Sequence, residues 1–233
     1  IVFFRDRPFE RYSFRIHPDK KKIAMILKWA LPIGLESILF CFLSMVTSRI
    51  EASFGANAVA ASKVGSQVES LSWLIGGGFG SALVAFIGQN YGAGKQERIR
   101  KGVRTSAAAM AVWGVFVTLF LIFAGGFVFS LFLPDPEMVK LGVPYLRILA
   151  FCQLTFNLEA VGAGAFKGTG RTLQPSLVSV VSNIIKPILA LFLSRTSLGL
   201  YGVWIAISLT AILRGVWVCV WYIVSSRNQQ HDI

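Results

Sequence analysis

The chain has 233 residues, of which 55% are hydrophobic, 13% are aromatic and only 15% are charged. With a mean hydropathy of +0.64, this composition excludes an ordinary soluble domain and indicates a protein of the lipid bilayer. The formal net charge of +12 would suggest a nucleic-acid partner in a soluble protein. Here the lysines and arginines lie between apolar runs, without a separate globular domain that could read nucleic acid. We therefore expect no nucleic-acid partner, and we attribute the basic charge to membrane topology and anionic lipid headgroups.

The first 26 residues differ from the rest because they carry a dense basic stretch. Ile1 to Phe4 is typical of the end of an apolar helix, whereas residues 5–22 hold Pro8, Pro18 and many lysines and arginines but no apolar run. We expect residues 1–26 to be the end of a preceding helix and a basic cytoplasmic linker. We therefore expect the chain to be a fragment of a longer protein.

Six long apolar runs follow the linker. A helix needs about 20 mainly apolar residues to cross a hydrocarbon core about 30 Å thick. Runs of that length lie at residues 27–52, 58–90, 104–132, 139–166, 173–194 and 200–225. The expected fold class is therefore all-α, a polytopic membrane protein with six transmembrane helices in residues 27–225 and a cytoplasmic tail at 226–233. Four glycines in the second run predict a bend or a patch of close helix packing: Gly76, Gly77, Gly78 and Gly80.

The distribution of lysine and arginine predicts the orientation of these spans. Basic residues are concentrated before the first span, after the second and after the fourth, and they are scarce in the alternate connections. Because lysine and arginine are retained on the cytoplasmic side during insertion, both ends should face the cytoplasm, and we expect a multi-pass protein of a bacterial cytoplasmic (inner) membrane. Residues 93–104 also favour a short helix on the inner surface, since Ile99 and Val103 are spaced so that both could reach the acyl chains.

Three carboxylates fall inside apolar runs, where an ionisable group costs several kcal/mol and usually faces a bundle interior or a wet cavity. Glu36 lies about eight residues inside the first span and Glu159 about eight residues before the end of the fourth, so both should be about 12 Å deep. Two carboxylates at one depth could exchange Na⁺ or H⁺ for a cationic solute. Either could instead be neutralised near its helix end by Lys28, Lys167 or Arg171.

The third carboxylate, Glu69, lies near the middle of the second run and is the most deeply placed of the three. It could bind an ion, or it could belong to a polar stripe with Lys63, Ser66 and Gln67 that has no ion to bind. Such a stripe marks either a hydrated solute path or polar contacts between helices.

Two cations also lie inside apolar runs and need partners. Lys186 stands beside Pro187, which frees a backbone carbonyl in the fifth span, and Arg214 lies midway along the sixth. The acids could therefore serve only to neutralise these cations, with Lys63 as a third intramembrane charge partner. That structural pairing is the main alternative to an ion-coupling site. Glu51, by contrast, ends the first span near the outer surface, where a charged side chain can snorkel, and we interpret it as structural.

Residues 88–95, Gly-Gln-Asn-Tyr-Gly-Ala-Gly-Lys, end the second span. A phosphate-binding loop would need glycine in place of Gln89 and serine or threonine in place of Gln96, which excludes that interpretation. The segment resembles instead the Gly-Gln-x-x-Gly-Ala signature of the multidrug and toxic compound extrusion family. The signature positions are Gly88, Gln89, Gly92 and Ala93. Further similarity to the family lies at Pro32–Glu36, Gly55–Ala61 and Gly164–Thr172.

The resemblance covers nearly the whole chain in order and implies a fold and a function. Members of the family are cation-coupled efflux transporters with two six-helix lobes, which open a central cavity alternately to either side of the membrane. This chain resembles the C-terminal lobe, and residues 5–22 resemble the link from the first lobe. The partners it implies are the missing N-terminal lobe of the same polypeptide, small organic cations as substrates, and membrane lipids.

The resemblance also bears on the coupling ion. In the Na⁺-coupled branch of the family, the second lobe holds a cation between an acid on its first helix and another on its fourth. Glu36 and Glu159 stand on those helices, each displaced by about one helical turn, roughly 5.4 Å. The H⁺-coupled branch has its key acid in the other lobe. The coupling ion is thus Na⁺ or H⁺, and no other cofactor is expected.

The function we expect is export of organic cations in exchange for Na⁺ or H⁺ by a secondary active transporter. An alternative within the same superfamily is a flippase of a lipid-linked precursor, in which Lys186 and Arg214 would meet phosphate. A membrane scaffold or enzyme is the remaining class. The sequence has no zinc-binding pattern, no aspartate pair in an inner loop and no Ser/His arrangement that would support catalysis.

Overall fold

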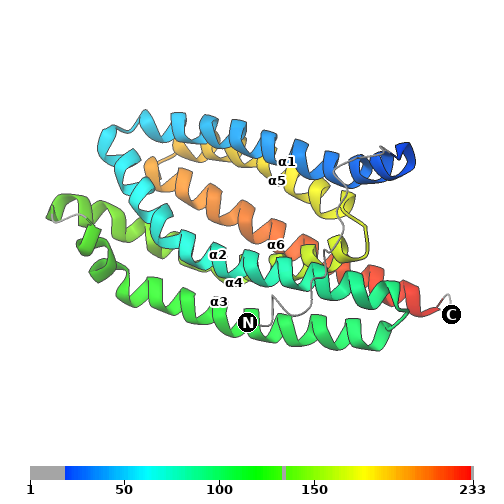
Figure 1. The fold of residues 1–233 in the computed structure, drawn as a ribbon. Helices are drawn as coiled ribbons and strands as arrows, with labels where there is room; N and C mark the ends of the chain where they lie inside the picture. The colour runs from blue at the N-terminus through cyan, green and yellow to red at the C-terminus, as the bar shows by residue number, and fades with distance from the viewer. Residues whose placement is uncertain (1–18, 133–134, 232–233) are drawn as a thin grey trace, which may run out of the picture.

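A computed structural model describes residues 19–132 and 135–231, with side chains described as far as Ser226. These residues form six helices and no strand, which confirms the all-α fold (Figure 1). The helices are α1 (Lys20–Ala52), α2 (Ala56–Gly92), α3 (Gln96–Phe132), α4 (Pro136–Gly168), α5 (Leu173–Ser194) and α6 (Leu200–His231). Each contains a stretch long and apolar enough to cross a membrane. The prediction for residues 1–18 lies outside the described part of the chain.

The first helix begins earlier than its apolar run. Asp19 caps α1, because its side chain accepts a hydrogen bond of 2.9 Å from the Lys21 amide, which would otherwise have no partner. Residues 20–26, expected in the linker, are therefore helical.

The third helix also begins early. α3 starts at Gln96, so the basic residues 96–104 are continuous with the third span, and the separate surface helix expected at 93–104 is wrong. The physical reason is the position of Ile99. This side chain is buried against Leu83 and Ile87 of α2 rather than turned towards lipid, which fixes the start of α3 against α2.

The helix α4 lies at the centre of the lobe and packs against α2, α3 and α6. α5 packs against α6 on one side and α1 on the other, so α1 and α3 stand at opposite sides of the bundle (Figure 1). The span of α1 is almost entirely exposed within this lobe. α1 therefore offers a long apolar surface to lipid or to another protein segment.

The segment that ends α2 has a specific backbone role. Gly94 adopts a φ of +68°, Gly94 N donates to Tyr91 O at 3.1 Å, and Lys95 N donates to Asn90 O at 2.9 Å. These two bonds form a Schellman motif, which satisfies the last carbonyls of a helix and requires a left-handed residue, usually glycine. Gly88 faces the end of α4, where an added Cβ would lie 3.6 Å from Gly168 O. The motif therefore stops α2 beside the end of α4.

The glycines of α2 form a close-packing patch. An added Cβ at Gly80 would lie 3.0 Å from Ala160 O, and one at Gly164 would lie 2.9 Å from Gly80 O. At Gly77 and Gly78 nothing lies within 4 Å of such an atom. Small residues allow this backbone approach between membrane helices, where lipid gives no hydrophobic force between them. Gly80 thus brings α4 close to α2, which positions the polar side chains described below.

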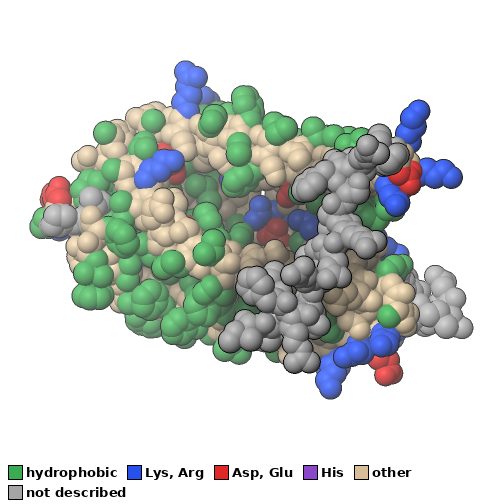
Figure 2. Space-filling view, in the orientation of Figure 1, with side chains coloured by type: hydrophobic (Ala, Val, Ile, Leu, Met, Phe, Trp, Pro, Cys, Tyr) green, Lys and Arg blue, Asp and Glu red, His purple; other side chains and the backbone are tan. Residues whose placement is uncertain are grey.

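The outer surface is mainly apolar, with lysines and arginines near the ends of the bundle (Figure 2). Figure 2 also shows a hollow at the centre of this face, in which both basic and acidic side chains are visible. Charged groups at this depth are costly unless they meet partners or water. The hollow is therefore the part of the lobe in which to look for a site.

We predict that Gly164→Ala in the full-length protein lowers its stability by about 1–3 kcal/mol, because the new Cβ meets the α2 backbone rather than a flexible side chain. The matched control is Gly78→Ala, which meets nothing and gains up to about 1 kcal/mol of helix propensity. Thermal unfolding in detergent measures both. Equal melting temperatures for the two variants would contradict the close packing.

Candidate solute and ion site

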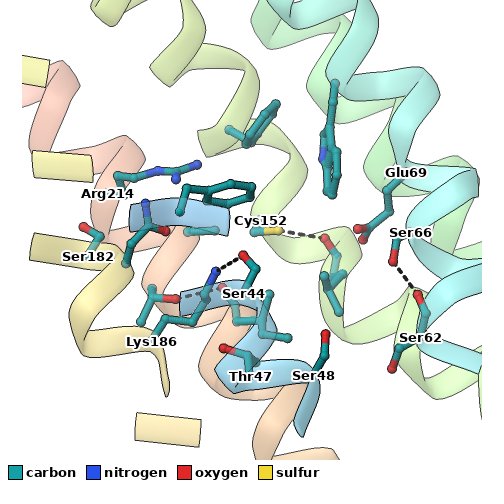
Figure 3. Close-up of a pocket in the computed structure, with 18 of the residues that line it drawn as sticks. Ser44, Thr47, Ser48, Ser62, Ser66, Glu69, Cys152, Ser182, Lys186 and Arg214 are labelled. Atoms are coloured by element: carbon teal, nitrogen blue, oxygen red, sulfur yellow. Dashed lines mark hydrogen bonds between the residues drawn. The ribbon is translucent and has the colours of Figure 1, made fainter. Parts of the chain in front are cut away.

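The hollow is an open cavity of about 330 Å³ lined by residues of five of the six helices, with α3 outside it. Its walls combine aromatic rings with polar groups. The rings are Phe40, Trp73, Tyr145 and Phe156. The polar and charged side chains are Ser44, Thr47, Ser48, Glu51, Ser62, Lys63, Ser66, Glu69, Ser182, Asn183, Lys186, Thr210 and Arg214. Most of them are labelled in Figure 3, together with Cys152 of the same lining. An apolar pocket with a few converging polar groups is typical of a small-molecule site.

Hydroxyl groups supply much of this polarity without breaking the helices. Thr47 Oγ1 donates to Leu43 O at 3.0 Å, and Ser66 Oγ donates to Ser62 O, each one turn back along its own helix. Such back-bonding satisfies the hydroxyl hydrogen inside the hydrocarbon, while the oxygen can still accept a bond from the cavity.

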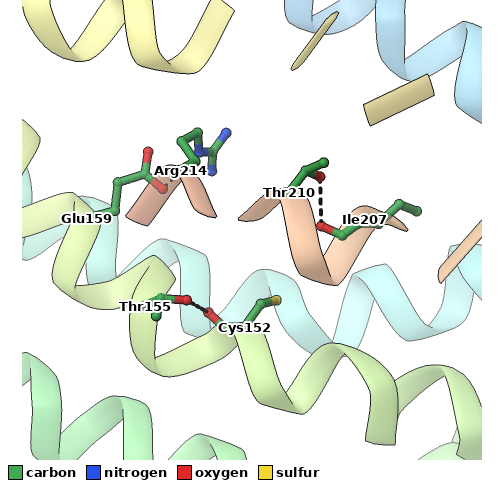
Figure 4. Close-up of polar contacts among 6 residues, drawn as sticks. All are labelled: Cys152, Thr155, Glu159, Ile207, Thr210 and Arg214. Atoms are coloured by element: carbon green, nitrogen blue, oxygen red, sulfur yellow. Dashed lines mark hydrogen bonds and ion pairs between the residues drawn. The ribbon is translucent and has the colours of Figure 1, made fainter. Parts of the chain in front are cut away.

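The strongest charged contact joins α4 to α6. Arg214 Nε donates to Glu159 Oε2 at 2.8 Å, and the two side chains are only 16% and 12% exposed (Figure 4). The guanidinium also lies 6.0 Å from the centre of the Phe156 ring. The sequence left open whether the intramembrane acids bind an ion or neutralise Lys186 and Arg214. In the structure, Glu159 and Arg214 form an ion pair, so each neutralises the charge of the other.

Glu36 has a different partner from Glu159. Ser176 Oγ of α5 donates to Glu36 Oε2 at 2.8 Å, and the glutamate is half-buried. The two acids are near enough for their charges to interact, yet neither lines the cavity. Within residues 19–132 and 135–226, no three His, Cys, Asp or Glu side chains group as ligands for a metal ion. A Na⁺ at Glu36 and Glu159 would have to compete with Arg214 for the second carboxylate.

Glu69 is the acid that the structure leaves without a cation. It is 1% exposed; Gln153 Nε2 donates to its Oε1 at 3.4 Å, and its Oε2 has no hydrogen-bond partner among the described residues. Burying an unpaired carboxylate in an apolar medium is so costly that the group is stable there only when a proton or another cation neutralises it. Glu69 therefore has the environment that an ion-binding carboxylate needs.

The groups around Glu69 form a polar seam between α2 and α4 that the sequence analysis missed. Asn157 Nδ2 donates to Ser72 Oγ at 3.2 Å, and Tyr145 OH lies 3.5 Å from Ser66 Oγ. The amide oxygens of Gln153 and Asn157, both fully buried, have no partner in the described structure. Gln153 and Asn157 are four residues apart in an apolar run, and this i, i+4 spacing was the available sign that both face one neighbour.

Glu51 is also part of the cavity, which differs from its expected position as a structural residue near the surface. It is 6% exposed and lies beside Ser62 and Trp204. Trp204 Nε1 donates to Ser62 Oγ at 3.0 Å, which ties α6 to α2 at this end of the cavity. The Glu51 side chain is therefore buried beside Ser62 and Trp204 and does not extend to water.

The remaining two predicted charges, Lys186 and Lys63, line the cavity on different helices. Lys186 Nζ donates to Ser44 Oγ at 3.4 Å and lies 5.0 Å from the centre of the Phe40 ring. Lys63 is exposed. No ion pair involves either lysine within the part of the chain that the structure describes. The expected charge partnership is thus present for Arg214 but not for the two lysines.

Residues 32–192 match the family model described as MatE. The chain belongs to the MatE family. The match begins in α1 and ends in α5, and it includes the Gly88–Lys95 segment that ends α2. The resemblance identified from the sequence is confirmed.

Two relatives of this MatE chain have different named functions. The "Probable multidrug resistance protein NorM" of Thermotoga maritima is 24% identical over 215 residues, which are 91% of this chain and 46% of the relative. The "FAD transporter" of Shewanella oneidensis is 25% identical over 221 residues, 93% of this chain and 48% of that protein. The chain thus spans about half the length of the curated relatives it matches.

A solved structure of MATE in the straight conformation has the same fold, with a TM-score of 0.87 at 17% identity. The match covers 99% of this chain and 53% of that chain. A MatE transporter therefore contains about twice as much structure as this six-helix unit.

We predict that Glu159→Gln and Arg214→Met each lower the stability of the full-length protein by about 3 kcal/mol, because each leaves the other charge buried without its partner. The double variant should recover at least half of that loss. Thermal and denaturant unfolding measure the coupling.

Glu137 and Lys140 provide the matched control, since their side chains are 84% and 78% exposed at a separation of 3.8 Å. Neutralising this exposed pair should leave stability unchanged. Additive losses at Glu159 and Arg214 would contradict a mutually dependent buried pair.

Proposed function

We propose that this chain forms the C-terminal lobe of a multidrug efflux antiporter, which exports organic cations in exchange for Na⁺ or H⁺ by alternating access. The single observation that carries the proposal is the cavity inside the lobe, which combines aromatic walls with the buried acids Glu51 and Glu69. Membership of the MatE family supports a transporter rather than an enzyme or a scaffold. We further propose a bacterial cytoplasmic membrane, with the basic ends of the lobe in the cytoplasm.

Glu69 is the carboxylate that we propose for the coupling ion. It lines the cavity, is buried and has no cationic partner in the described structure, whereas Glu159 is held by Arg214 and Glu36 by Ser176. A proton or Na⁺ bound to Glu69 would remove the electrostatic cost of burying its negative charge. A cationic solute that replaced this ion would neutralise the same charge. Competition for one carboxylate is the simplest physical basis for antiport.

The aromatic walls support an organic cation as the exported solute. Trp73 and Phe156 lie on α2 and α4 with ring centres 5.8 Å apart, and both line the same cavity as Glu69. Aromatic faces attract organic cations by about 0.5–2 kcal/mol each. The flippase alternative has less support, because Arg214, one of the two cations that would meet phosphate, already binds Glu159.

The transport cycle needs the other lobe as a partner. The long apolar surface of α1 and the length ratio to the relatives both support an N-terminal lobe of the same polypeptide packed against this one. Lipid would then cover the remaining apolar surface.

We predict that Glu69→Gln lowers ion-driven efflux of a cationic dye from proteoliposomes by at least about tenfold, equivalent to about 1.4 kcal/mol in the barrier. Separate Na⁺ and pH gradients identify the coupling ion in the wild-type protein. Glu36→Gln and Glu159→Gln are measured alongside, and the exposed Glu137→Gln is the matched control.

Unchanged efflux in Glu69→Gln would exclude this residue as the coupling carboxylate. A loss of efflux in Glu36→Gln and Glu159→Gln but not in Glu69→Gln would mean that Glu36 and Glu159 bind the coupling ion.

A further inference from the structure

We propose that Lys186 forms an anion-binding subsite inside the cavity, which takes the carboxylate or phosphate of an aromatic, zwitterionic solute. The subsite rests on the proposed transport function, because it names a second recognition point for the same solute.

Lys186 is a cation that the lobe positions but does not neutralise. It lies on α5 next to Pro187, in a helix that crosses the membrane. Its only polar contact in the described structure is the Ser44 hydroxyl at 3.4 Å, and no carboxylate lies within 4.0 Å. A hydroxyl oxygen cannot balance a full charge, and an unpaired ammonium in the hydrocarbon costs several kcal/mol.

The other charges of the cavity increase the need for an anion at Lys186. Arg214 and Lys186 both line the cavity, so two positive charges share it, and their mutual repulsion is unfavourable. Glu51 lines the same cavity, but no ion pair joins it to Lys186 in the described structure, and it lies beside Ser62 and Trp204 instead. An anion bound at Lys186 would relieve the repulsion.

Hydrogen-bond donors near Lys186 fit a carboxylate or phosphate. Asn183 and Ser182 precede Lys186 by three and four residues on α5, so they share its face of the helix, and both line the cavity. Both are buried, with exposed fractions of 4% and 7%. An ammonium with neighbouring hydroxyl and amide donors is the donor set that binds such anions.

The arrangement of charges selects a zwitterion rather than a simple anion. Figure 3 shows Lys186, Arg214 and Ser182 on one side of the cavity, and Glu69 with Ser66 on the opposite side. The rings of Phe156 and Trp73 line the space along with them. A solute with an aromatic body, a cationic group at Glu69 and an anionic group at Lys186 would neutralise these two unpaired charges at once.

A matched pair of dyes tests the subsite in the purified full-length protein. Rhodamine B carries a cationic xanthene and a free carboxylate, whereas its ethyl ester has the same ring system without the negative charge. We expect Lys186→Gln to weaken rhodamine B binding about tenfold or more, as for a charge-assisted hydrogen bond, and to change binding of the ester by less than about twofold. Fluorescence polarisation measures binding, and proteoliposome efflux measures transport.

Two variants serve as controls. Lys186→Arg keeps the charge and should keep most of the preference for the free carboxylate. Lys140→Gln removes an exposed lysine remote from the cavity and should change neither dye. Equal losses for both dyes in Lys186→Gln would overturn the subsite and make Lys186 a structural residue, as would a wild-type protein that binds the two dyes equally.

Two further results separate this proposal from its alternatives. Wild-type protein that binds rhodamine B through Lys186 but exports neither dye would contradict the transport function while supporting the subsite. Displacement of rhodamine B by phosphatidylglycerol, but not by phosphatidylcholine, in mixed micelles would mean that a lipid headgroup occupies Lys186, and it would overturn the assignment to a solute.

Discussion

The structure depends on one constraint: inside the hydrocarbon a polar group must find its partner within the protein. α4 supplies many of these partners, because it packs against α2, α3 and α6 and its polar side chains form hydrogen bonds with α2 and α6. Glu159 binds Arg214 of α6, and Gln153 and Asn157 face Glu69 and Ser72 of α2. The close approach at Gly80 and Gly164 makes the contacts with α2 possible.

The same constraint separates structural from functional groups. Glu159 and Arg214 neutralise each other, and breaking such a pair costs more than the pair contributes. Glu69 and Lys186 lack partners of opposite charge in the described structure, although both are set in a cavity of the membrane-spanning bundle. A protein keeps such unpaired charges only where something else binds them, so an ion and a solute are their natural partners.

The sequence predicts the architecture well because long apolar runs, a glycine cluster and a short signature motif are local signals. The number of helices, the packing role of Gly80 and the family all followed from them. Side-chain partners did not, because they depend on how each helix rotates about its axis, which periodicity alone does not fix. Glu36 and Glu159 share a depth but bind α5 and α6, and Glu51 lines the cavity although it ends its helix. The seam at Gln153 and Asn157 was detectable only from its four-residue spacing.

The most direct test of the central claim is whether the cavity inside this lobe is a water-accessible solute site. The measurement is labelling by a membrane-impermeant thiol reagent of Ser48→Cys in a full-length protein whose Cys41, Cys152 and Cys219 are alanine. We expect labelling that a transported dye prevents, and none at Phe127→Cys on the apolar outer face of α3. Ser48→Cys that stays unlabelled throughout the cycle, or that is labelled equally with and without dye, would contradict a solute site in this cavity.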